Sequence, residues 1–305
     1  MTRVAAIDVG TNSTRLLVAE SHAEGFRPID RRMTITRLGQ GVDRRRALAP
    51  EALRRTLATI ADYAAACGEY EVQLIRVTGT SAVRDARNRD EFFSGVRRLT
   101  GSDPELLSGE AEARVTFLGA TSDLDTGSIL VVDIGGGSTE LIYGSAEPER
   151  LVSMDIGCVR LFEKYLASDP PSPGELDALR AEVDTHLTTA KEALEVPAGT
   201  RLVGVAGTVT QLATLKAGVP VYDPDVTHHA VLSHGDVRSL SRRLASLTYE
   251  HRKLVPGLEP GRVDVIVAGA EILLRVMEVF DAPEVLVSER DILDGLVLEL
   301  LEEAS

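Results

Sequence analysis

Cysteine is scarce in this chain of 305 residues, and long uncharged apolar runs are missing from it. The two cysteines, Cys67 and Cys158, cannot build a disulfide framework, and such low cysteine usage fits a reducing compartment. A membrane-spanning helix needs about 20 consecutive apolar residues. Asp8 interrupts the first apolar run, so a signal peptide is not expected either. These absences favour a cytoplasmic protein that does not enter a membrane.

Positive charge is also in deficit, because the net charge is −14 at pH 7. This balance excludes general binding to nucleic acid or to an anionic membrane surface, so any anion site must come from local arrangement. Arginines do gather locally, in a first group of seven and in a second group after it: Arg27, Arg31, Arg32, Arg37, Arg44, Arg45 and Arg46, then Arg84, Arg87 and Arg89. A charge run such as Arg44–Arg46 fits an exposed turn as well as a substrate contact.

Two segments share one template. Val4–Leu17 reads VAAIDVGTNSTRLL and Leu130–Ile142 reads LVVDIGGGSTELI, each with an apolar strand that ends in Asp before a Gly-rich turn. Glycine allows positive φ and close backbone approach, so the N–H groups of such a turn can converge on an anion. Asp8 and Asp133 could hold a hydrated Mg²⁺ beside that anion. We expect two such hairpins to face each other and form a phosphate clamp.

The order of apolar patterns predicts an α/β fold with two lobes, residues 1–125 and 126–305, joined by the Asp123–Ser128 stretch. We expect a helix at Glu110–Gly119, a strand at Val263–Val267, and a terminal helix at about 292–303 that packs back on the first lobe. Ligands are expected in the crevice between the lobes.

Several motifs, in order along nearly the whole chain, resemble the exopolyphosphatase/guanosine pentaphosphate phosphatase (Ppx/GppA) family. They are IDVGTNSTR (7–15), RLGQGVD (37–43), TSAVRDARN (80–88), SGEAEAR (108–114), DIGGGSTE (133–140), VAGTVTQL (205–212), DVIVAGAE (264–271) and VSERDILDG (287–295). The resemblance implies a two-lobed actin/sugar-kinase/Hsp70-like ATPase (ribonuclease H-like) fold with duplicated domains.

The resemblance also implies hydrolysis of a phosphoanhydride by metal-assisted attack of water, with Glu112 as the catalytic base. The family usually has a Glu pair before Ala-Arg, whereas this chain has Ala111 and then Glu112. Glu112 is therefore the carboxylate in register, because Glu110, two positions away on a helix, points elsewhere.

The remaining site residues follow from the same resemblance. Glu140 would orient the water, and Asp133, Asp8 and Glu140 would hold Mg²⁺, with Mn²⁺ as the alternative. A helix N-terminus after a Gly-containing turn, as at Gly207, is itself an anion site. The expected phosphate-binding residues are Thr11, Asn12, Ser13, Arg15, Arg84, Gly135, Gly136, Gly137, Ser138, Thr139, Gly207 and Thr208.

The leading hypothesis is an exopolyphosphatase that removes terminal orthophosphate from short inorganic polyphosphate, with the other arginines guiding a polyanionic tail. Longer members of the family carry extra C-terminal helical domains, which is why short polymers are favoured here. Guanosine pentaphosphate 5′-phosphatase, an activity of the stringent response that forms the tetraphosphate, would use the same residues. A kinase or ATPase of the same fold group and a catalytically silent sensor are further alternatives. A homodimer is expected only because symmetric oligomers are common.

Some residues have a simpler interpretation. Arg84 could pair with Asp85 or Asp90 instead of a phosphate. His228 and His229, with His234 nearby, lack a settled ligand set, so we expect a loop there and not a metal site. Cys158 lies in an apolar stretch and is expected in the core.

Overall fold

The computed structural model describes residues 2–23, 25–125 and 127–304. The chain forms two compact units: unit 1 comprises Met1–Ser122 and Arg290–Ser305, and unit 2 comprises Asp123–Glu289. Thr126, which is part of the expected linker, lies outside the described residues.

Unit 1 is built on a mixed sheet with the strand order β3-β2-β1-β4-β5. β1 pairs antiparallel with β2 and parallel with β4. Its strands and helices are β1 (Arg3–Val9), β2 (Ser13–His22), β3 (Gly25–Ile35), α1 (Val42–Arg45), α2 (Pro50–Glu69), β4 (Leu74–Gly79), α3 (Ser81–Asp85), α4 (Arg89–Thr100), β5 (Glu105–Leu106), α5 (Gly109–Thr121) and α13 (Ile292–Glu303).

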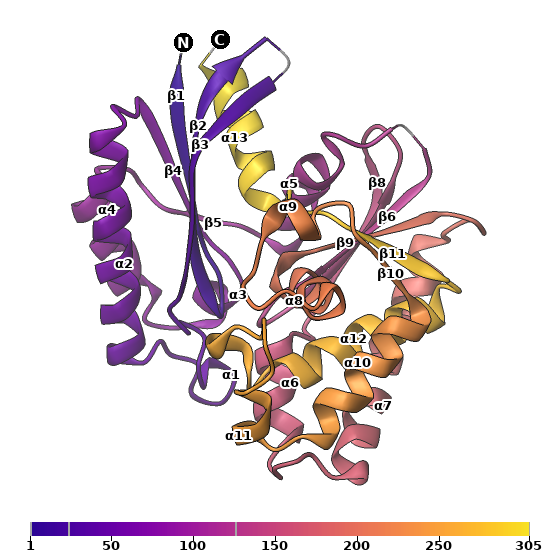
Figure 1. Ribbon diagram of the computed structural model, residues 1–305. Helices are drawn as coiled ribbons and strands as arrows, with labels where there is room; N and C mark the ends of the chain where they lie inside the picture. Colours follow the sequence, from indigo (N-terminus) through magenta and orange to yellow (C-terminus); the bar gives the residue numbers. More distant parts are fainter. Residues whose placement is uncertain (1, 24, 126, 305) are drawn as a thin grey trace. The chain divides into compact units, whose positions relative to one another are not determined.

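Alternation along β1 gives this sheet two apolar faces. Ala5, Ile7 and Val9 pack into the core formed with α2 and α4, while Val4 and Ala6 pack against α5 and α13 on the other face. Figure 1 shows the two helix layers on either side of the sheet. Because successive side chains of a strand point to opposite faces, an apolar run such as Val4–Ile7 is what a sheet covered on both faces requires.

Helix α13 belongs to unit 1 although it ends the chain. It packs against α5, β1 and β2, so the second unit ends at Glu289 and does not extend to residue 305. Two glycines permit the close contact: a Cβ at Gly119 would lie 1.9 Å from the carbonyl oxygen of Asp291, and one at Gly295 would lie 2.0 Å from that of Val115. The helix expected at 292–303 therefore packs on the first unit, as the sequence predicts.

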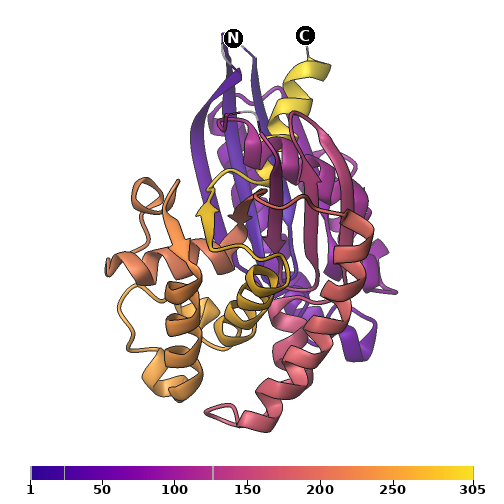
Figure 2. The same cartoon turned by 90° about the vertical axis from the view of Figure 1, so that its right-hand side faces the viewer.

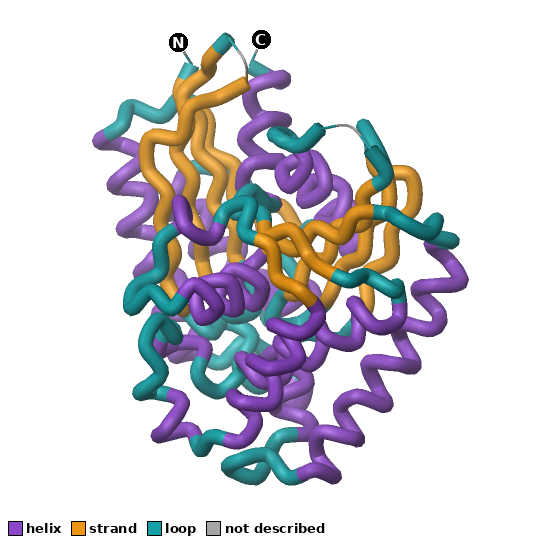
Figure 3. Tube along the Cα trace, turned by 45° about the vertical axis from the view of Figure 1, so that its right-hand side comes forward, coloured by secondary structure: helices purple, strands orange, loops and turns teal. Residues whose placement is uncertain are grey.

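Unit 2 contains a second mixed sheet, of order β10-β11-β9-β6-β7-β8. In each unit the strands form one sheet flanked by helices (Figure 3). The elements are β6 (Ile129–Ile134), β7 (Thr139–Gly144), β8 (Pro148–Met154), α6 (Cys158–Tyr165), α7 (Pro173–Leu194), β9 (Arg201–Val205), α8 (Ala206–Ala217), α9 (Pro224–Thr227), β10 (Val231–Ser233), α10 (His234–Ser246), α11 (Tyr249–Arg252), a 3₁₀ turn η1 (Pro260–Arg262), α12 (Ile266–Val279) and β11 (Glu284–Val287).

Helix α12 lies at the centre of the helical layer of unit 2, where it packs against α6, α7, α8 and α10 (Figure 2). Nearly all of its residues are buried, so its apolar pattern has no exposed face. Glu271 is the charged member of this buried set: Arg180 of α7 donates to both of its carboxylate oxygens, at 2.7 and 2.9 Å, and Ser241 of α10 donates at 2.6 Å. A buried carboxylate needs such partners, and these three side chains tie α7, α10 and α12 together.

One expected element is wrong. Val263–Val267 is not a strand, because Val263–Val265 forms a turn after η1 and α12 begins at Ile266. A short apolar run does not distinguish a buried strand from the start of a buried helix. Within the described residues, we find no helix with the length and hydropathy that crossing a bilayer demands.

The glycine contact between α5 and α13 can be tested by Gly119→Ala. The added methyl group collides with the backbone of Asp291, so we expect the free energy of unfolding to fall by roughly 1–3 kcal/mol, measured by urea denaturation. Gly174→Ala in α7 is the matched control, since nothing lies within 4 Å of its Cβ position. Equal stability of the two variants would contradict this packing.

Candidate phosphate-binding and catalytic residues

The first Gly-rich turn closes through a hydrogen bond from the Gly10 N–H to the Ser13 carbonyl, at 2.9 Å. The carbonyls of Thr11 and Asn12 accept from the N–H groups of Gly39 and Arg37, at 2.8 and 2.9 Å. A Cβ at Gly39 would lie 2.2 Å from the Thr11 methyl group, so the RLGQGVD motif supplies a glycine where the two loops touch. These bonds occupy the carbonyl side of the turn.

The opposite side of this turn retains hydrogen-bond donors. Among the residues that the structure describes, no acceptor faces the backbone N–H groups of Thr11 and Asn12, and the buried Asn12 side-chain amide has no partner either. An unsatisfied buried donor is costly, and an anion at this turn would satisfy it. The structure thus gives Thr11 and Asn12 the geometry that phosphate binding requires, while Ser13 begins β2.

Asp8 and Arg15 lie opposite each other on β1 and β2. Arg15 donates to Asp8 Oδ2 at 2.8 Å, and its other Nη donates to Asp291 at the N-cap of α13. Burial raises the pKa of Asp8 above its ordinary value, although the charge of Arg15 acts in the opposite direction. Arg15, expected to contact phosphate, is therefore placed as a counterion between two buried carboxylates.

Glu112 lies in the first turn of α5, whose N-cap residue Ser108 accepts from the Ala111 N–H. Glu112 is only 9% exposed. Arg84 donates to Glu112 Oε2 at 3.5 Å and to the Leu107 carbonyl at 3.0 Å. The arginine of TSAVRDARN thus pairs with the carboxylate of SGEAEAR, and not with Asp85 or Asp90.

The second Gly-rich turn repeats the closing bond of the first, from the Gly135 N–H to the Ser138 carbonyl at 3.0 Å. Its carbonyls at Gly135 and Gly136 accept from the N–H groups at the start of α6, and Arg160 Nε donates to the Gly137 carbonyl at 2.8 Å. In the described part of the chain, no acceptor faces the N–H groups of Gly136, Gly137 and Ser138. They form a set of donors suited to an anion.

Asp133 and Glu140 stand directly opposite each other on β6 and β7. Both are buried, at 7% and 1% exposure, and Ser153 of β8 donates to Glu140 Oε1 at 2.7 Å. Like charges directly opposite on neighbouring strands repel. Two carboxylates so placed offer only oxygen donors, which is the chemistry of a Mg²⁺ or Mn²⁺ site. Thr139 points elsewhere, since its hydroxyl donates to the Ile156 carbonyl.

Gly207 and Thr208 lie in the first turn of α8, which begins at Ala206. The Arg262 guanidinium packs on Gly207, where a Cβ would come within 1.9 Å of it. The charge of Arg262 adds to the positive potential at the N-terminus of α8. Thr208 is buried and packs against Gly269.

Cys158 is buried nearby in the core, as predicted, and burial raises the pKa of its thiol.

The structure thus gathers the predicted residues into local groups within each unit. Sequence reasoning missed Ser153, Arg160 and Arg262, which hold the Glu140 carboxylate, the second turn and the α8 N-terminus. None of these three residues lies in one of the eight motifs that resemble the family. The only signal was the position of Arg262, two residues before Asp264 of the DVIVAGAE segment.

His228 and His229 contact Asp123, with Nε2 atoms 2.9 and 3.5 Å from its Oδ2. One ligand atom from each of the three residues lies within 4.8 Å of the others. However, the Glu289 N–H donates to His228 Nδ1 at 3.2 Å. This bond places the proton of a neutral His228 ring on Nε2, directed at Asp123, so a metal at Nε2 would have to displace it. His234 instead contacts Glu278.

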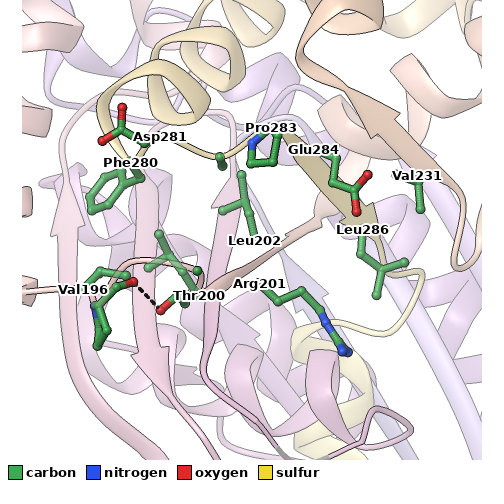
Figure 4. Close-up of a pocket in the computed structure, with 14 residues that line it drawn as sticks. Val196, Thr200, Arg201, Leu202, Val231, Phe280, Asp281, Pro283, Glu284 and Leu286 are labelled. Atoms are coloured by element: carbon green, nitrogen blue, oxygen red, sulfur yellow. Dashed lines mark hydrogen bonds between the residues drawn. The ribbon is translucent and has the colours of Figure 1, made fainter.

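A pocket of about 470 Å³ lies at the beginning of β9 and β11 (Figure 4). Leu202, Phe280 and Leu286 line it, and the Thr200 hydroxyl donates to the Pro197 carbonyl at its edge. Leu130, near the start of β6, also lines it, whereas Asp133 lies toward the other end of that strand. The pocket therefore belongs to the end of the sheet away from the Gly-rich turn.

Comparisons with known proteins agree with these motifs. The model of the Ppx/GppA phosphatase family matches residues 17–304. The chain is 39% identical to Exopolyphosphatase 2 of Mycobacterium tuberculosis over 98% of its length and 99% of the relative's. It is 28% identical to the guanosine-5′-triphosphate,3′-diphosphate pyrophosphatase of Vibrio vulnificus, covering 98% of this chain and 59% of that one.

Solved structures share the fold. The crystal structure of an exopolyphosphatase-like protein superposes with a TM-score of 0.95 at 35% identity, covering 100% of this chain and 99% of the other. The Ppx/GppA family member of Aquifex aeolicus superposes with a TM-score of 0.85 at 32% identity and the same coverage. The expected fold class, α/β in two lobes, is confirmed.

The counterion role of Arg15 leads to a stability prediction. In Arg15→Gln, Asp8 and Asp291 lose the charge between them, and we expect the free energy of unfolding to fall by about 3 kcal/mol in urea denaturation. Arg27→Gln is the control: Arg27 pairs with Glu20 but its side chain is 66% exposed, against 18% for Arg15. That variant should lose less than about 1 kcal/mol, and equal losses would refute the counterion role.

Proposed function

The chain belongs to the Ppx/GppA phosphatase family, and on that premise we propose that it is an exopolyphosphatase. It hydrolyses the terminal phosphoanhydride bond of inorganic polyphosphate, with preference for short chains, and releases orthophosphate. The fold group of this family also contains kinases, but the similarity to Exopolyphosphatase 2 over nearly the full length of both chains favours a hydrolase.

The observation that carries the proposal is the position of Glu112. It is a mostly buried carboxylate in the first turn of α5, with Arg84 as its neighbour. A base for water must be ionised and held in place. The contact with Arg84 limits the rotation of the side chain.

The reaction needs an oriented water and neutralisation of phosphate charge, not a covalent intermediate. In our proposal, Glu112 accepts a proton as the water oxygen bonds to the terminal phosphorus. The anhydride oxygen leaves with the bonding electrons on the shortened polymer. We assign phosphate binding to the N–H groups of Gly136, Gly137 and Ser138 in unit 2 and to the turn at Thr11 and Asn12 in unit 1, and Arg84 contributes charge.

We assign the divalent metal to Asp133 and Glu140, whose carboxylates are opposed on β6 and β7. A Mg²⁺ ion held by these two residues would supply neutralisation of phosphate charge, with Mn²⁺ as the alternative. Glu140 also orients the water. Asp8, which already pairs with Arg15, would contribute to metal binding through water. Gly207 and Thr208 extend the phosphate site at the start of α8, beside the Arg262 cation.

The substrate range, cellular location and oligomeric state of the protein are part of the same proposal. Guanosine pentaphosphate is the alternative substrate, because a family relative carries that activity in its name. We also propose a cytoplasmic location, which low cysteine usage favours, and a homodimer stays a prediction.

A substrate panel tests the proposal. Orthophosphate release is measured with tripolyphosphate, long-chain polyphosphate and guanosine pentaphosphate, each with Mg²⁺, with Mn²⁺ and with a chelator. We expect metal-dependent release from tripolyphosphate above all. Absence of release from any polyphosphate would end the proposal. Orthophosphate release from guanosine pentaphosphate alone would indicate the guanosine pentaphosphate 5′-phosphatase. Transfer of phosphate from ATP to an acceptor would indicate a kinase.

Replacing the base tests the role of Glu112. In Glu112→Gln we expect kcat to fall by roughly 10²–10⁴-fold with little change in KM, because the amide cannot accept the proton. Glu110→Gln is the matched control, since Glu110 lies in the same helical turn but is exposed. If Glu112→Gln keeps normal turnover, another group is the base.

A further inference from the structure

An exposed group of four arginines in unit 1 is not used by the function proposed above. Arg44 lies in α1, Arg46 caps its C-terminus, Arg87 follows α3, and Arg89 begins α4. We call these four residues the basic surface. All are exposed, and throughout the described residues no carboxylate lies within ion-pairing distance of any of them.

Backbone contacts hold the two parts of the basic surface together. The Arg87 N–H donates to the Arg46 carbonyl at 2.9 Å. The Asn88 side chain accepts from the Leu48 N–H at 2.8 Å and donates to the Leu48 carbonyl at 3.2 Å. The four charges therefore share one rigid region, although the two segments are about 40 residues apart. A run of charged residues that only contacts solvent does not need backbone hydrogen bonds of this kind.

The basic surface is also connected to the candidate site residues of the same unit. The loop before α1 is bonded to the first Gly-rich turn through the Gly39 and Arg37 N–H groups. On the other side, Arg84 of α3 precedes Arg87 by three positions and contacts Glu112. Arg84, which contacts Glu112, and the basic surface therefore lie on neighbouring segments of unit 1.

Arg45 is exposed like its neighbours, but its guanidinium has an internal hydrogen-bond partner. Its guanidinium folds back over Gly41, where a Cβ would come within 2.5 Å of it, and donates to the Gln40 carbonyl. Among the residues that the structure describes, the guanidinium groups of Arg44 and Arg46 make no contact of this kind. Unshielded like charges raise one another's free energy, and a bound polyanion would relieve that repulsion. In a chain of net charge −14, a local excess of this kind marks an anion-binding surface.

We propose that the basic surface binds the internal phosphates of a polyphosphate chain, several units away from the phosphate that is cleaved. This inference rests on the proposed function and adds a second subsite to it. Binding there is electrostatic and independent of any nucleoside, because guanidinium groups pair with phosphate oxygens. Substrates too short to reach the surface gain nothing from it, so the surface sets how affinity grows with chain length.

The experiment compares wild type with the triple variant Arg44→Gln/Arg46→Gln/Arg87→Gln. KM and kcat are measured for tripolyphosphate, long-chain polyphosphate and guanosine pentaphosphate. We expect KM for the long polymer to rise roughly tenfold, from the loss of three exposed charge contacts, while KM for tripolyphosphate stays within about twofold. Wild-type affinity for the long polymer should also weaken more steeply with salt, because exposed charges are screened within about 8 Å at physiological ionic strength.

The matched control is Arg98→Gln/Arg242→Gln/Arg243→Gln, which removes the same charge from other exposed positions. Its KM values should equal those of wild type. The proposal would be overturned if KM for the long polymer did not rise in the triple variant, or if it rose equally in the control. It would also be overturned if KM for tripolyphosphate rose equally, or if the rise were confined to guanosine pentaphosphate. Circular dichroism and the thermal midpoint check folding, and Arg44→Gln alone replaces the triple variant if that variant does not fold.

Failure of the proposed function gives a different result. In that case wild type releases no orthophosphate from either polyphosphate. Direct binding of long-chain polyphosphate to wild type and to the triple variant, measured by calorimetry, then decides the inference. Weaker binding by the triple variant but not by the control supports the surface, and equal binding refutes it.

Discussion

The burial of carboxylates is the constraint on which the rest of this structure depends. Asp133 and Glu140 face each other across two strands, and Asp8 lies under the turn of the first hairpin. Charge in a low-dielectric interior has to be compensated. In unit 1 an arginine of the chain itself supplies the compensation. In unit 2, the proposed divalent cation at the opposed pair would add to the compensation.

The two hairpins present similar backbone N–H donors but are held in place by different contacts. Each closes with a Gly-to-Ser backbone bond, at 2.9 Å in unit 1 and 3.0 Å in unit 2. The carbonyls of the first turn are bonded to the loop at Arg37 and Gly39, whereas those of the second are bonded to the start of α6. In both cases the acceptors are used internally and the donors remain, so each turn presents positive partial charge. Duplication of the template therefore conserved the electrostatic result and not the supporting contacts.

Local sequence was sufficient for some of this architecture. The hairpins, the cap at Ser108 and the position of Glu112 on α5 follow from short segments in which residue type and backbone preference agree. Long-range partners were not predictable: Arg15 and Asp291 are 276 positions apart, and no spacing rule connects them. Val263–Val267 was misread because a fully buried helix has no polar face from which its period could be recognised.

The discontinuity of unit 1 has a consequence for biosynthesis. Its sheet and α5 leave the ribosome early, but α13, whose residues cover one face of that sheet, emerges only after all of unit 2. At about 5–20 residues per second, the intervening segment takes roughly ten to thirty seconds to translate. During that interval the apolar face formed by Val4, Ala6 and Leu17 lacks its C-terminal cover. Unit 2, being continuous, can finish folding before the nascent first unit does.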